Sequence, residues 1–271
     1  MDKKPKKGKL AIIDADGLLF YAGWAYREQL TRVGEMAAKE RVDKLIKRIL
    51  DKINATHYIG FYGKPGSKTF RHNWVTLRPY KGNRHEEPWQ TFFKPRIKNH
   101  FGEKWGFHGV ENIEADDAVV IAFHHFKDEW DIIMVGEDKD AQQIGEHTQF
   151  NPNSSHFKII QHTQEEGRKF FWYQMLVGDN TDNIPGVEGV GKANIAVKTL
   201  NELVNPSEEE MYELVRHEYL KKYGKEYLYY MLENYILLKM LTKPKFDYPQ
   251  IIEPILYKTI AGNLNKKILK I

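Results

Sequence analysis

Four short groups of acidic residues are the part of this sequence whose types and spacing could do chemistry. Carboxylates that converge a few ångström apart resist joint ionisation, so they need cations. Ligands that are all oxygen, with no cysteine in the chain, favour Mg²⁺ or Mn²⁺ over Zn²⁺. The groups are Asp14 and Asp16; Glu114, Asp116 and Asp117; Asp138 and Asp140; and Asp179 and Asp182. Asp16 is the weakest member, because it can instead cap a helix that begins there.

Alternating strands and helices are expected to bring these groups together. Apolar runs predict strands at 9–13, 57–62 and 131–135, and apolar residues at 3 and 4 spacing predict a helix at 42–53. A further helix is expected at 114–126. This alternation predicts an α/β fold with a mostly parallel central sheet flanked by helices. The carboxyl ends of such strands form the ligand edge, where Asp14 and Asp138 would converge.

The chain changes character after about residue 163. Helices are expected at 168–178, 207–223 and 225–241, with a glycine-rich stretch at 186–191 and an uncertain tail after Pro244. We interpret this part as a helical subdomain that packs on the sheet. The predicted organisation is a basic tail at 1–8, an α/β domain at 9–176 with an arch at about 78–104, and a helical subdomain at 177–271.

The charge is distributed unevenly along the chain. The 271 residues include 41 lysines and arginines against 37 aspartates and glutamates, a net charge of +4. Residues 64–104 hold ten basic residues against three glutamates, a local +7, which could follow a phosphate backbone or be only a solvated surface. The lysines of residues 1–9 could likewise bind phosphate groups or only solubilise the chain. The lack of cysteine, of a signal-peptide core and of an apolar run of about 20 residues favours a cytoplasmic protein without membrane contact.

Five motifs in order resemble those of the 5′→3′ exonuclease and flap endonuclease family. They are Ile-Ile-Asp at 12–14, Arg-Pro-Tyr-Lys-Gly-Asn-Arg at 78–84, Glu-Ala-Asp-Asp at 114–117, Asp-Lys-Asp at 138–140 and Gly-Asp-Asn-Thr-Asp-Asn-Ile-Pro-Gly at 178–186. Bacteriophage exonucleases and the 5′-nuclease domain of bacterial DNA polymerase I are similar members. The resemblance implies a PIN-like fold and a Mg²⁺-dependent nuclease, with Mn²⁺ as a substitute, that cuts DNA at free 5′ ends, flaps or forks by two-metal-ion catalysis during replication or repair.

The resemblance also implies roles for individual residues. Lys81 and Arg84 would act on the phosphate as catalytic residues, with Arg78 and Tyr80 of the same motif contacting DNA. It places Asp14, Glu114, Asp116 and Asp117 in a first metal site, and Asp138, Asp140, Asp179 and Asp182 in a second. One departure is visible: relatives carry an aspartate after the second strand, where this chain has Gly63 and Lys64. That difference puts the number of metal ions in doubt, and Lys64 could replace some positive charge.

A glycine-rich turn follows the last acidic motif. Gly189 and Gly191 permit a tight turn whose backbone N–H groups can hold a phosphate, with Lys192 beside it. The pattern is similar to the helix-three-turn-helix of the family, which grips the duplex backbone without reading sequence. The resemblance implies that carbonyl groups of such a turn can hold K⁺.

The arch region mixes aromatic and basic residues. Lys94, Arg96 and Lys98 are predicted DNA-binding residues that interleave with aromatic rings at 89, 92 and 93, a mixture suited to stacking and neutralising a threaded single strand. Pro95 is expected to break or kink a helix here, as in a mobile arch. The alternative is an ordinary amphipathic helix with its aromatic residues in the core.

Two other interpretations stay open. A small metal-dependent ribonuclease with a similar acidic sheet would lack the motif at 78–84 and the glycine-rich turn. A structure-specific DNA-binding protein with a degenerate nuclease site is favoured only by Gly63 and Lys64. The sequence leaves open whether RNA in RNA–DNA hybrids is cut, and it favours a monomer.

Overall fold

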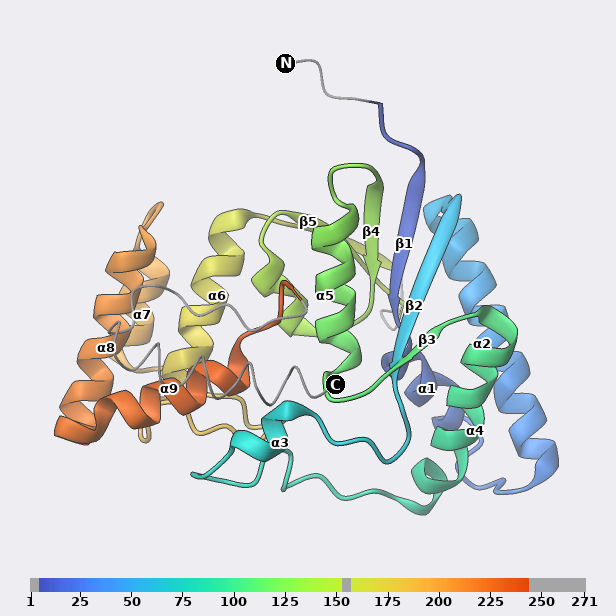
Figure 1. The fold of residues 1–271 in the computed structure, drawn as a ribbon, viewed down its shortest axis with the longest axis horizontal. Helices are drawn as coiled ribbons and strands as arrows, with labels where there is room; N and C mark the ends of the chain where they lie inside the picture. The colour runs from blue at the N-terminus through green and yellow to red at the C-terminus, as the bar shows by residue number, and fades with distance from the viewer. Residues whose placement is uncertain (1–4, 153–156, 244–271) are drawn as a thin grey trace.

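The computed structural model describes residues 5–152 and 157–243, and in these residues a six-stranded sheet forms the centre of the molecule (Figure 1). The strands are β1 (Lys9–Asp14), β2 (His57–Gly63), β3 (His108–Val110), β4 (Asp131–Val135), β5 (His147–Asn151) and β6 (Lys158–His162). Their order is β3-β2-β1-β4-β5-β6, and every pair is parallel except β5 with β6. The predicted mostly parallel sheet is therefore confirmed, and β3, β5 and β6 are additions to the three predicted strands.

Helices surround the sheet on both faces and at one end. They are α1 (Ala15–Trp24), α2 (Arg32–Ile53), α3 (Phe70–Trp74), α4 (Pro88–Trp105), α5 (Ala115–Phe126), α6 (Gln164–Val177), α7 (Ile195–Glu202), α8 (Glu208–Tyr223) and α9 (Tyr227–Leu238), with the short 3₁₀ turns η1 (Lys139–Ile144) and η2 (Gly224–Glu226). The last predicted helix ends at Leu238, three residues before its expected end at 241. The predicted tail after Pro244 lies outside the described residues.

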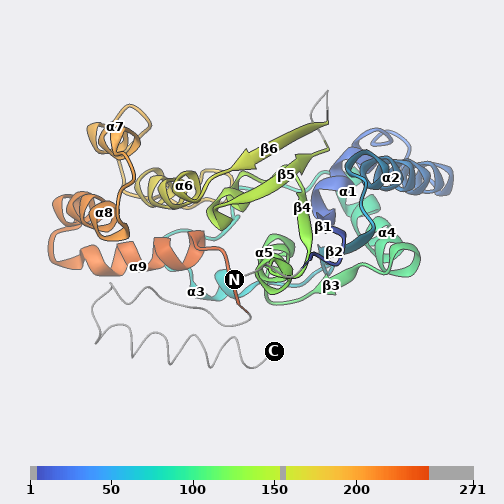
Figure 2. The same cartoon turned by 90° about the horizontal axis from the view of Figure 1, so that it is seen from above.

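The central strand β1 has apolar side chains for each face of the sheet. Ala11 and Ile13 pack with α1, α2 and α4, whereas Leu10 and Ile12 pack with α5 and β4. This alternation follows from the two-residue period of a strand. Figure 2 shows the result, with α5 on one side of the strands and α1, α2 and α4 on the other. A parallel strand buried on both faces ends in a fixed position, so the carboxylate at its end is placed accurately.

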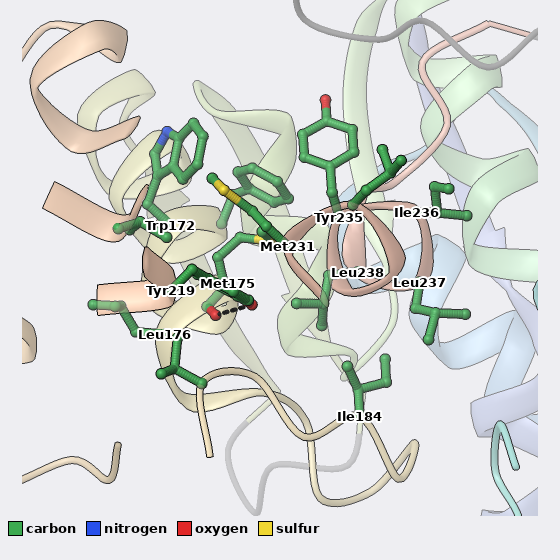
Figure 3. Close-up of a cluster of buried hydrophobic side chains, with 14 of the residues drawn as sticks. Trp172, Met175, Leu176, Ile184, Tyr219, Met231, Tyr235, Ile236, Leu237 and Leu238 are labelled. Atoms are coloured by element: carbon green, nitrogen blue, oxygen red, sulfur yellow. Dashed lines mark hydrogen bonds between the residues drawn. The ribbon is translucent and has the colours of Figure 1, made fainter. Parts of the chain in front are cut away.

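A second hydrophobic core joins the helices α6 to α9 (Figure 3). Trp172 and Met175 of α6 pack there with Tyr219 of α8 and Tyr235 of α9, and the Tyr219 hydroxyl donates to the Met175 carbonyl at 2.7 Å. This core already contains α6, which the predicted boundary at residue 176 assigns to the nuclease domain.

Helix α4 runs without a break through Pro95, so of the two expectations for this proline, a break or a kink, the break is wrong. Trp89, Phe93, Ile97 and Phe101 recur at four-residue spacing and are buried against α1, α2 and the sheet. That burial outweighs the backbone hydrogen bond that a proline removes. Within the described ranges, no helix is long and apolar enough to cross a membrane.

Candidate active site

The first aspartate of three acidic pairs is oriented by the backbone amide two residues later. Asp14 at the end of β1 accepts from the amide of residue 16 at 3.0 Å, Asp138 after β4 accepts from residue 140 at 2.8 Å, and Asp179 accepts from residue 181 at 2.8 Å. The aspartate side chain favours such local bonds at the start of a helix or turn. Asp14, and not Asp16, is therefore the N-cap of α1. Because β1 and β4 are parallel neighbours, Asp14 and Asp138 emerge at the same edge of the sheet.

The loop at 178–186 brings the last acidic pair to that edge. Asp179 and Ile184 exchange two backbone hydrogen bonds, at 2.9 and 2.8 Å. Gly178 and Gly186 both have positive φ, and a Cβ on Gly186 would lie 2.3 Å from the Gly178 nitrogen. The two glycines thus permit a backbone approach that other residues would block.

These acidic groups line an open cavity of about 560 Å³. Its lining contains seven of the eight predicted metal ligands together with both predicted catalytic residues: Asp14, Glu114, Asp116, Asp138, Asp140, Asp179, Asp182, Lys81 and Arg84. The eighth predicted ligand, Asp117, does not line the cavity and is fully buried. Oxygen atoms of Glu114, Asp116 and Asp117 nevertheless lie within 4.8 Å of one another.

The electrostatics of the cavity favour a bound cation. Burial raises the pKa of the Asp14 carboxyl to about 8, and the charges of Asp16 and Asp138 add to the effect. Burial likewise raises the pKa of Asp140 to about 7, with Asp138 and Asp179 contributing. A metal cation that binds these carboxylates competes with protons for them and stabilises their ionised form. The residues fit a hard divalent cation such as Mg²⁺, which prefers carboxylate oxygen ligands.

Glu114 differs from its acidic neighbours because cationic side chains of the protein already balance its negative charge. Burial opposes its ionisation, but Lys81 and Arg71 lower the pKa of its carboxyl to about 2. The Lys81 ammonium forms an ion pair with Glu114 and lies 3.6 Å from Asp182. The Tyr80 hydroxyl lies within hydrogen-bond distance of two carboxylates, 2.6 Å from Glu114 and 2.9 Å from Asp182. Lys81 thus stands between two acidic groups from distant parts of the chain.

Comparison with known proteins identifies the family. The family model of the "5'-3' exonuclease, N-terminal resolvase-like domain" matches residues 9–169. The chain belongs to this family. DNA polymerase I of Streptococcus pneumoniae serotype 4 is 29% identical over 212 residues, which cover 71% of this chain and 23% of the polymerase. A 5'-3' exonuclease of Mycoplasmopsis pulmonis is 25% identical over 237 residues, 83% of this chain and 77% of that protein.

Solved structures confirm the fold. A T5 5'-exonuclease with bound zinc ions superposes with a TM-score of 0.60 at 18% identity, covering 97% of this chain and 99% of that one. A bacteriophage T5 D15 flap endonuclease in complex with DNA and metal ions gives a TM-score of 0.56 at 15% identity, with 97% and 98% covered. The chain spans about a quarter of the length of the polymerases that it matches.

The family resemblance predicts a carboxylate after β2, where this chain has Gly63. An ion pair occupies this place: the Lys98 ammonium lies 2.9 Å from Asp16 and donates to the Gly63 carbonyl at 2.6 Å. Asp16 also accepts from the Gly63 amide at 3.3 Å. Lys64, which the sequence suggested as a substitute charge, instead pairs with Glu111 at 2.6 Å and does not line the cavity. Lys98, and not Lys64, is therefore the cation that contacts Gly63.

The predicted DNA-binding residues other than Tyr80 lie in two parts of the structure. Arg78, Gly189, Gly191 and Lys192 line one open cavity of about 890 Å³ between α6 and the start of α7. Lys94, Arg96 and Lys98 lie on α4, where Arg96 stacks on Phe92 with its guanidinium carbon 4.0 Å from the ring centre.

Two corrections concern aromatic residues. Tyr80 is a predicted DNA contact, but it is 5% exposed and its hydroxyl is hydrogen-bonded to carboxylates of the site. It therefore contacts the acidic residues inside the protein. Trp89 and Phe93 are 4% and 0% exposed, so the prediction that they stack on a single strand is wrong. The alternative of a core-facing aromatic helix is the correct one for these two residues, because the apolar face of α4 covers the sheet.

Sequence reasoning missed two polar residues that contact the acidic groups and a third that contacts one of these two. Arg71 of α3 binds Asp117, and Gln174 of α6 donates to Asp140 at 2.7 Å. Gln143 of η1 in turn donates to Gln174 at 2.8 Å. Their hydrogen bonds in the folded chain single them out, and no spacing in the sequence does so.

Proposed function

We propose that the chain hydrolyses phosphodiester bonds of DNA from 5′ ends, both as a 5′→3′ exonuclease and as a 5′-flap endonuclease, in DNA replication or repair. The observation that carries this proposal is the cavity in which seven carboxylates meet beside Lys81 and Arg84. Membership of the 5'-3' exonuclease family supports it. The active form proposed is a monomer with Mg²⁺, for which Mn²⁺ can substitute.

The residues divide into two proposed metal groups. Divalent ions bound there would activate the attacking water and neutralise charge on the departing 3′ oxygen. The first group comprises Asp14, Glu114 and Asp116, and the second comprises Asp138, Asp140, Asp179 and Asp182. Glu114 would be ionised before any metal arrives, because Lys81 and Arg71 overcome the effect of burial and lower the pKa of its carboxyl to about 2.

Lys81 and Arg84 are the proposed phosphate-binding residues. Both now hold Asp182: Lys81 lies 3.6 Å from it, and Arg84 forms an ion pair with it. With metal ions bound to the carboxylates, these two side chains would be available to stabilise charge that builds on the phosphoryl oxygens. Lys81 is one of the few non-glycine residues with positive φ among those described, which fixes its direction within the loop.

The cavity near Gly189 is the proposed contact for duplex DNA. Its lining includes the basic side chains Arg78, Lys139 and Lys192 and the glycine turn at 189–191. A Cβ on Gly189 or Gly191 would meet no atom within 4 Å, so the turn faces open space where a backbone phosphate could approach. We propose K⁺ binding to carbonyl groups of this turn as a further feature.

A DNA-binding protein without nuclease activity is the second candidate, and Gly63 is the observation that favours it. RNA in RNA–DNA hybrids is a proposed additional substrate. The ribonuclease alternative has lost support, because the motif at 78–84 contacts the acidic cavity as the exonuclease resemblance requires.

A 5′-flap substrate labelled at either end tests the proposal. With Mg²⁺ we expect release of the labelled flap and of short 5′ products, and with excess EDTA we expect none. The 3′-labelled strand should shorten only from its 5′ side. Binding of the flap without cleavage in both Mg²⁺ and Mn²⁺ would reject the nuclease and favour the second candidate.

A further inference from the structure

The chain segment that ends α9 lies directly behind the acidic residues. We call residues 237–241 the strap. The Leu237 and Lys239 carbonyls accept from the Arg71 guanidinium at 2.9 and 3.0 Å, and the Leu241 amide donates to Asp117 at 3.1 Å. The Met240 side chain borders a small cavity together with Asp14, Asp116 and Asp138. The strap therefore reaches the buried side of the site, although it belongs to the helical part of the chain.

Arg71 and Asp117 attach one side of the strap to the first acidic group. Arg71 is 1% exposed and Asp117 is fully buried, and their side chains meet through two hydrogen bonds, one of 2.9 Å. Arg71 also reaches Glu114 at 3.3 Å, and Asp117 accepts from the Glu114 backbone amide at 3.2 Å. Both oxygens of Asp117 are thus occupied by protein donors.

Two glutamines attach the other side of the strap to the second acidic group. The Gln143 side chain donates to the Leu238 carbonyl at 2.9 Å and accepts from the Met240 amide at 3.1 Å. It also donates to Gln174, whose amide donates to Asp140 at 2.7 Å. Gln174 is 1% exposed and Gln143 is half-buried, so the hydrogen bond of Gln174 to Asp140 is the part of this chain that is shielded from water.

We infer that the strap is a positioning element that fixes both carboxylate groups relative to each other, with Arg71 and Gln143 as its positioning residues and Asp117 as part of its attachment. This inference rests on the proposed metal site. Hydrogen-bond partners behind metal ligands set the orientation of those ligands, and their loss typically weakens metal binding by about 10- to 100-fold. A change in the conformation of the strap at the end of α9 would therefore alter the positions of both carboxylate groups.

Metal affinity measured without DNA tests the strap. Mn²⁺ is titrated calorimetrically into the full chain and into Arg71→Lys, Gln143→Leu and the double variant. Arg71→Lys keeps the charge beside Asp117 and Glu114 but loses the planar fork that reaches two carbonyls at once. We expect each single variant to bind Mn²⁺ about tenfold more weakly. The double variant should lose less than the product of the single effects, because both substitutions loosen the same segment.

Tyr219→Phe is the matched control. It removes a buried hydrogen bond in the same helical core, to Met175, without touching the strap. Its Mn²⁺ affinity should equal that of the unmodified chain even where its melting temperature falls. The inference would be overturned if the strap variants bind Mn²⁺ within twofold of the unmodified chain. It would also be overturned if the affinity loss of the double variant equals the product of the two single losses. If Arg71→Lys does not fold, Gln143→Leu alone decides. An unmodified chain that binds no Mn²⁺ would instead refute the proposed function.

Discussion

Asp138→Asn is expected to reduce DNA cleavage by at least about a thousandfold, the scale of several kcal/mol that metal ions contribute to such reactions. The asparagine oxygen can still accept from the Asp140 amide, which Asp138 does now at 2.8 Å, so the turn after β4 should keep its shape. The substitution removes one negative charge at the point where the two acidic groups meet: the charge of Asp138 helps to raise the pKa of Asp14, Asp116 and Asp140.

Single-turnover cleavage of a flap substrate measures the rate, and fluorescence anisotropy in Ca²⁺ measures binding. Binding should stay within about threefold, because phosphate contacts with basic residues dominate affinity. Asp131→Asn is the matched control, since Asp131 lies exposed at the opposite end of the same strand. Cleavage by Asp138→Asn at the rate of this control would refute the assignment of the site.

Lys81→Ala is expected to lower the cleavage rate by about 10²- to 10³-fold, as the loss of one preorganised group that stabilises transition-state charge typically does. The ammonium group is mostly buried and lies between Glu114 and Asp182, so its charge acts directly on both carboxylates. Its removal also takes away the first cation that holds the pKa of Glu114 low.

The effect of Lys81→Ala should fall mainly on kcat, with a smaller change in KM, because the proposed charge stabilisation develops in the transition state. Lys44→Ala is a suitable control, since Lys44 is an exposed lysine of α2 that pairs with Glu40 at 2.6 Å on the surface of the same helix. A loss confined to KM would show that Lys81 only binds DNA. A rate within threefold of the control would exclude it from catalysis.

The parallel sheet and the meeting of the acidic groups were predictable, because they depend on local patterns. The buried run that ends in Asp14 and the run that ends at Val135 each determine a strand, and the carboxyl ends of parallel strands meet at one edge of the sheet. Seven of the eight predicted ligands line one cavity. Asp117 is the exception, since nothing in the motif at 114–117 shows that Arg71, 46 residues earlier, engages both of its oxygens.

Alternatives that depend on tertiary packing were not predictable from residue types alone. The aromatic residues of α4 could face either DNA or the core, and the four-residue spacing of Trp89, Phe93 and Ile97 acquires its meaning only from the sheet beneath them. Pro95 would break an isolated helix, but packing preserves this one. Gln143 carries no local signal, because its partners at Leu238 and Met240 are far away in sequence.

Anomalous diffraction from crystals soaked in Mn²⁺ tests most directly whether these carboxylates form a metal centre. We expect anomalous peaks within coordination distance of the oxygens of Asp14, Glu114 and Asp116, and of the group formed by Asp138, Asp140, Asp179 and Asp182. We further expect that Asp117 remains bound to Arg71 and contacts neither ion. If neither group shows a Mn²⁺ peak and Lys81 is still bound to Glu114, the assignment of a metal centre is contradicted.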